Sequence, residues 1–199
     1  MRKRNCCFYG KKIMRKYLIF TILVLVMCLA GAQVATAVTE FVSTIKETGG
    51  EYSTLATWQA SNQCDLTTSM VLSHGGITGT IADGSYVKGV TSAAYGTAIH
   101  VTPTQIAIKT ITGTFINGER IDKTTTLNGT ATGTDYVTAT SAPDSMISIA
   151  KIDGAWTVAD TAAVTINGWT TSATNYIKIY TTDSARHHGV WDATKYIYA

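Results

Sequence analysis

Apolar and polar positions alternate along most of residues 38–199 in short runs, which is the pattern of half-buried β-strands. The run 106–109 alternates residue by residue, and in 176–180 two isoleucines share one face while tyrosines and a lysine share the other. The alternation predicts a chain built almost entirely of short strands. The expected strands are 40–45, 70–73, 77–81, 85–90, 97–102, 105–112, 119–121, 136–140, 146–150, 163–166, 176–180 and 196–198.

Turn signals and composition support the same fold class. About a fifth of residues 38–199 are threonine, and only two prolines occur there, Pro103 and Pro143. Threonine, valine, isoleucine and tyrosine fit a pleated, half-buried surface. Pairs typical of tight turns separate the runs, so we expect an all-β protein. These pairs are Gly75-Gly76, Asp83-Gly84, Asn117-Gly118, Asn128-Gly129, Asp153-Gly154 and Asn167-Gly168.

Two segments break the strand pattern. In residues 53–61, Leu55, Trp58 and Gln59 fall at helical spacing and Ser53 can cap the first turn, so a short helix is expected. Residues 122–135 are polar and are expected to form an exposed loop. The glycine-marked strands between about 70 and 139 are short and bent, which favours closure as a small antiparallel barrel.

The first 37 residues have the order of an export signal. A basic stretch precedes an apolar run at 17–30, and Ala35-Thr36-Ala37 has the small-x-small form that signal peptidases cut. The apolar run is shorter than the roughly 20 residues that cross a bilayer, so we expect cleavage after Ala37 and membrane contact only during export. An uncleaved anchor is the alternative. The predicted location is outside the cell or on its surface.

Removal of residues 1–37 changes the charge and the cysteine content. Those residues hold seven of the 16 basic residues and none of the 13 acids, so residues 38–199 carry nine bases against 13 acids, a net charge of −4. An acidic chain without a basic cluster is not expected to bind nucleic acid. Only Cys64 remains, so no internal disulfide can form.

Two stretches resemble the opening of secreted and phage-associated right-handed parallel β-helix proteins of the pectate-lyase-like kind. The first is the segment 48–58, with Gly49-Gly50 and Trp58, and the second runs from Ile166-Asn167-Gly168-Trp169 to His187. The resemblance implies a β-helix-like cap with a short helix over 38–67 and β-helix-like strands over 146–199. Residues 68–145 depart from that pattern and are interpreted as an inserted small barrel with a polar linker.

No catalytic, cofactor or metal residues are predicted. His187 and His188 lie near two aspartates, but neighbours in a strand point to opposite faces and no further ligand has fixed spacing. Aspartates that could serve a glycoside hydrolase or lyase lie near turns, where aspartate is expected to bond to the backbone. They are Asp153, Asp160, Asp183 and Asp192.

Aromatic residues are the stronger functional lead. Trp169, Tyr176, Tyr180 and Trp191 are candidates for stacking against sugar rings, and core packing is the alternative. The first functional hypothesis is therefore a secreted or cell-surface structural or adhesive protein that contacts carbohydrate. A second is the N-terminal part of a polysaccharide lyase or hydrolase of the parallel β-helix type. A third is a filament subunit that self-associates through strand edges.

Overall fold

The computed structural model describes residues 38–199, which belong to one compact unit. The predicted signal peptide, with its cleavage residues Ala35 and Ala37, lies outside the described residues. Within the described part of the chain, no helix has the length and apolar character needed to cross a bilayer. All nine described strands belong to one sheet, and the all-β prediction is confirmed.

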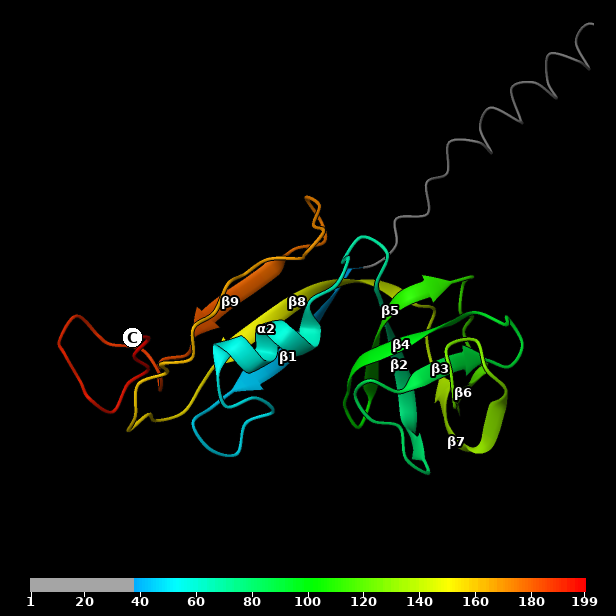
Figure 1. Ribbon diagram of the computed structural model, residues 1–199, viewed down its shortest axis with the longest axis horizontal. Helices are drawn as coiled ribbons and strands as arrows, with labels where there is room; N and C mark the ends of the chain where they lie inside the picture. Colours follow the sequence, from blue (N-terminus) through cyan, green and yellow to red (C-terminus); the bar gives the residue numbers. More distant parts are fainter. Residues whose placement is uncertain (1–37) are drawn as a thin grey trace, which may run out of the picture. The chain divides into compact units, whose positions relative to one another are not determined.

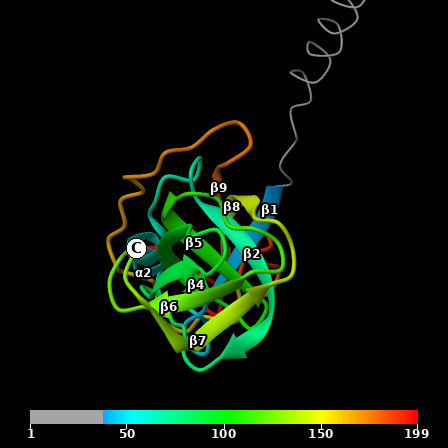
Figure 2. The same ribbon diagram turned by 90° about the vertical axis from the view of Figure 1, so that its right-hand side faces the viewer.

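Six of the strands close into an antiparallel barrel. Their order is β2-β5-β4-β3-β6-β7, and β7 pairs back onto β2 to close the ring. A bulge between His74 and Ile77 of β2 accompanies the closing pair and bends the strand. Figures 1 and 2 show the barrel from the side and from its end. The strands are β2 (Met70–Thr78), β3 (Tyr86–Gly89), β4 (Tyr95–Val101), β5 (Gln105–Thr112), β6 (Arg120–Thr124) and β7 (Ala131–Ala139).

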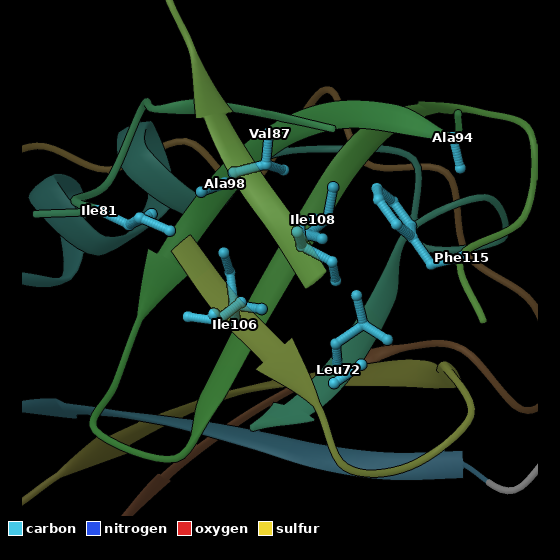
Figure 3. Close-up of a cluster of buried hydrophobic side chains, with 11 residues drawn as sticks. Leu72, Ile81, Val87, Ala94, Ala98, Ile106, Ile108 and Phe115 are labelled. Atoms are coloured by element: carbon cyan, nitrogen blue, oxygen red, sulfur yellow. The ribbon is translucent and has the colours of Figure 1, made fainter. Parts of the chain in front are cut away.

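The barrel interior is filled by aliphatic side chains and one phenylalanine, which point toward one another from the strands and from the segments that connect them (Figure 3). Leu72, Ile106, Ile108 and Ile121 have no exposed surface, and Phe115 closes one end of the cluster. Strand alternation supplies these residues, since every second position on β2 and β5 faces inward. The interior of the barrel is therefore a packed hydrophobic core.

The other three strands form a parallel sheet. β8 (Asp144–Ile152) lies between β1 (Val38–Ile45) and β9 (Ile177–Thr181), and Phe41, Ser148 and Ile177 are aligned across it. The first residues of β8 also pair with β2, which joins this sheet to the barrel. The barrel is thus attached at the end where the parallel strands begin.

One short helix covers the inner face of the parallel sheet (Figure 1). α2 (Leu55–Asn62) begins after Thr54, whose side chain accepts a hydrogen bond from the backbone N–H of Thr57, so the cap lies one residue beyond the expected Ser53. Trp58 is completely buried and packs with Ile45, Ala150 and Ile152 from the sheet.

The predicted parallel β-helix is wrong, both as a cap over 38–67 and as coils over 146–199. The parallel strands number three within residues 38–199, and the dominant element is the closed antiparallel barrel. Residues 163–166 are coil, and the segment 196–198 makes only an isolated bridge. The sequence of residues 38–67 determines a local strand, turn and helix. A unit of this kind can pack on any small parallel sheet and does not require a β-helix.

The region expected to form a small antiparallel barrel, 68–145, contains all six barrel strands. The polar segment 122–135 is only partly a loop, because β6 extends to Thr124 and β7 begins at Ala131. Polar threonines in this segment lie in a hairpin whose outer face meets solvent. From the polarity pattern alone, such a hairpin is predicted to be an unpaired loop.

Candidate functional site

Three charged residues from separate segments meet at one point beside the barrel. His100 lies on β4, Asp83 lies in the turn before β3, and Glu51 lies in the loop between β1 and α2. His100 Nδ1 is 2.8 Å from Asp83 Oδ2, and His100 Nε2 is 3.3 Å from Glu51 Oε1. Asp83 also accepts a hydrogen bond from the backbone N–H of Val101 at 2.9 Å. Each ring nitrogen of His100 therefore faces a carboxylate.

The two carboxylates keep His100 protonated. Burial by itself lowers the pKa of this imidazole, but the hydrogen bond to Asp83, the close contact with Glu51 and the charges of both carboxylates raise its pKa to about 9. Burial raises the pKa of Glu51, but its ion pair with His100 and its hydrogen bond from the backbone N–H of Thr44 hold that pKa below its ordinary value. The cluster thus carries a bound proton at neutral pH.

The surroundings of His100 connect the barrel to the parallel sheet. The Phe41 ring of β1 lies edge-on at 5.6 Å between ring centroids, and the Tyr52 ring lies at 5.8 Å. One side of His100 borders an open groove with mostly apolar walls. The groove is lined by Gly76, Ile77, Ile81, Ala82, Asp83, His100, Val101, Thr102 and Pro103.

The chemistry of Glu51, Asp83 and His100 is better suited to holding their three segments together than to catalysis. A general base must have a free nitrogen and a pKa near the working pH, and His100 has neither. Sequence reasoning missed the cluster, because the positions 51, 83 and 100 follow no spacing. The local pattern at Asp83-Gly84 predicts a turn and no more than that.

Trp169 packs against α2. Its ring stacks on Trp58 with centroids 5.5 Å apart, and its Nε1–H donates to Gln59 Oε1 at 2.6 Å. Gln59 in turn donates to the backbone oxygen of Asn167 at 2.8 Å. These contacts fix the segment around 167–170 against α2, and they occupy one face of the Trp169 ring.

Tyr176 and Tyr180 are both exposed and lie on the same face of the parallel sheet, on either side of Lys178. The Lys178 Nζ lies 5.3 Å from the centroid of the Tyr180 ring and 4.0 Å from Glu40 Oε1 of β1. This face therefore carries aromatic rings with a paired cation between them.

Trp191 lies in the loop after β9 and is 72% exposed, and its neighbour Val190 is 76% exposed. The Trp191 ring stacks on His187 with centroids 5.2 Å apart and an angle of 22° between the planes. Among the described residues, no ring contact joins the four predicted aromatics to one another. They occupy three separate places.

The aspartates singled out from the sequence make structural hydrogen bonds. Asp153 accepts from the hydroxyls of Thr182 and Ser184, which hold its pKa well below the usual range. Asp160 is buried and accepts from the N–H of Leu55 at 3.0 Å and from the hydroxyl of Tyr196 at 3.2 Å. Each ties the chain after β8 to a neighbouring segment.

The histidine pair lies in the same loop as Trp191. His188 Nε2 lies 3.2 Å from the backbone oxygen of Asp183, and His187 Nδ1 accepts from the N–H of Asp192 at 3.1 Å. Across residues 38–199, no group of three or more histidine, cysteine or acidic side chains has an arrangement that could hold a metal ion.

A scan against protein-family models and searches of curated proteins and of solved structures find no match to this chain. The resemblance to pectate-lyase-like proteins therefore stays a prediction from the sequence.

Proposed function

We propose that this chain is an exported structural or adhesive β-protein that contacts carbohydrate through the loop that carries Trp191. The observation that carries the proposal is a large apolar ring, 72% exposed, backed by a second ring at stacking distance. Val190 and Trp191 form an adjacent exposed apolar pair. Contiguous exposed apolar surface marks interaction sites, and tryptophan is among the residues that dominate binding energies. One face of a sugar ring is apolar and can lie flat on the free face of an indole.

The loop around Trp191 is held in place at both ends. Ala185 is completely buried, and its backbone oxygen accepts from the N–H of Tyr196 at 2.8 Å. The Asp192 side chain accepts from both the N–H and the hydroxyl of Thr194. A loop ordered before binding loses little conformational freedom on contact with a ligand, which favours affinity.

Trp191→Ala is expected to weaken polysaccharide binding at least about tenfold, since it removes the exposed ring. The measurement is binding of the full chain to immobilised neutral polysaccharides such as cellulose, chitin and xylan, and to acidic ones such as pectate and alginate. Val158→Ala, at an apolar side chain exposed to 66%, is the matched control and should bind as the unchanged protein does. Absence of binding to every polysaccharide would contradict the proposal.

The export part of the proposal has its own test. Protein recovered from the medium or the cell envelope of an expressing host should begin at Val38, because cleavage is expected after Ala37. The double variant Ala35→Leu, Ala37→Leu should keep the preceding segment, since bulky residues replace the small ones. A cytosolic protein with residues 1–37 intact would show that this part is wrong.

A further inference from the structure

Among residues 38–199, the backbone groups along one edge of the parallel sheet pair with no other strand. Ser148 N–H donates to the oxygen of Tyr176 at 3.1 Å, and Thr182 N–H donates to the oxygen of Ile152 at 2.9 Å, so even-numbered residues of β9 face β8. In an extended strand the N–H and C=O of one residue point to the same side, so odd-numbered residues face away. Within residues 38–199, β9 pairs with no other strand. The residues that face the open edge are Ile177, Ile179 and Thr181.

The opposite edge of the sheet, formed by β1, is partly closed. The backbone N–H of Thr44 donates to Glu51 Oε2 at 2.6 Å, and the oxygen of Thr44 accepts from the N–H of Tyr52 at 3.1 Å. A carboxylate and a loop therefore occupy the place of an incoming strand, which is a common protection of sheet edges. β9 has no such cover in the described part of the chain.

The sequence of β9 is complementary to itself in an antiparallel pair centred on Ile179. Ile179 then lies opposite Ile179 of the second copy and exchanges two hydrogen bonds with it. Lys178 lies opposite Tyr180 of the second copy, so no two lysines face each other. Ile179 is 39% exposed in one chain, and the pair buries both isoleucines.

The placement of the barrel favours this antiparallel arrangement over a head-to-tail filament. The barrel is attached where β8 begins, so antiparallel pairing of two β9 strands puts the two barrels at opposite ends. If β1 of a second copy were added in parallel to β9, the two barrels would lie only three strand spacings apart, about 14 Å. That is less than the width of a six-stranded barrel with its side chains, so the barrels would collide.

We infer that two copies of this chain associate by antiparallel pairing of their β9 strands about Ile179, which gives a closed two-fold dimer with a continuous six-stranded sheet. Two-fold dimers are the commonest symmetric assemblies, and they use one patch on both copies. The dimer is independent of the proposed carbohydrate contact. The interface is small, so dissociation constants in the micromolar range are expected.

Sedimentation of the full chain at about 100 μM tests the dimer at this expected affinity. The unchanged chain should form dimers, and Ile179→Lys should shift it to monomer, because it places two charges opposite each other. Val42→Lys is the matched control: Val42 lies on β1, is also 39% exposed, and should leave the dimer intact. A monomeric unchanged chain, or a dimer that persists in Ile179→Lys, would overturn the inference.

Cross-linking tests the register without destabilising substitutions. In a chain with its four cysteines changed to alanine, Ile179→Cys should form an intermolecular disulfide under mild oxidation, since paired Cα atoms lie about 5.5 Å apart. Tyr176→Cys should not, because the two copies of this position lie at opposite ends of the strand pair. Equal cross-linking at both positions, or none at Ile179→Cys, would contradict the antiparallel pairing.

Discussion

Trp58→Ala is expected to lower the free energy of unfolding by about 4 kcal/mol, the middle of the range for removal of a buried aromatic ring. Trp58 has no exposed surface and lies where α2 meets the parallel sheet, against Ile45 and Ile152. It also stacks on Trp169, so the cavity would open between three segments of residues 38–199 that no disulfide joins. Urea denaturation followed by circular dichroism measures the loss.

Trp58→Phe separates packing from hydrogen bonding at the same position. The buried Nε1 of Trp58 has no hydrogen-bond partner among residues 38–199, so phenylalanine removes volume and no bond. The expected loss is about 1 to 2 kcal/mol, as for other partial core truncations. If Trp58→Ala unfolds no more easily than the unchanged protein, α2 does not pack on the sheet as described.

His100→Leu is expected to lower the free energy of unfolding by about 3 kcal/mol at pH 6. A pKa raised from 6.5 to about 9 corresponds to about 3 kcal/mol of stabilisation of the charged imidazole in the folded protein. The variant also leaves Glu51 and Asp83 without their cation. Both carboxylates are partly exposed, so solvent screens the remaining repulsion and the loss stays near this figure.

The effect of His100 has a defined pH dependence. Because the folded pKa is raised above the unfolded value, the stabilisation is fully present below pH 6.5 and is lost as the pH rises through about 9. The difference between the unchanged protein and His100→Leu should therefore shrink between pH 6.5 and about 10. Denaturant titrations at several pH values measure it.

His74→Leu is the matched control for this pH dependence. His74 is also buried, but burial lowers its pKa, and within residues 38–199 neither of its ring nitrogens meets a carboxylate. His74→Leu should therefore lose stability above pH 6.5 to the same extent as the unchanged protein does. Parallel stability curves for the unchanged protein and His100→Leu between pH 6.5 and 9.5 would contradict the assigned cluster.

The same cluster shows the limit of reasoning from this sequence. Glu51, Asp83 and His100 come from a loop, a turn and a strand, and closure of the barrel beside β1 brings them together. No local sequence pattern predicts that these three side chains lie together. The unpaired edge of β9 is a similar case, since it depends on which strands pair around β8.

The sequence by itself determined the features that depend on neighbouring residues. Alternating side chains and threonine-rich runs gave the all-β class, and bent short strands between 68 and 145 indicated the barrel. The spacing of Leu55, Trp58 and Gln59 indicated the helix within one residue of its cap. These are consequences of backbone conformation and side-chain periodicity, which act over a few residues.

Only the tertiary structure decided how the strands are paired. The segments 38–45, 144–152 and 177–181 have strand patterns that fit a parallel coil as well as a three-stranded sheet beside a barrel. The choice depends on long-range packing, with Trp58 and Ile152 on one side and the β2 contact of β8 on the other. Periodicity marks which face of a strand is buried, but the identity of its partner comes from contacts far apart in the chain.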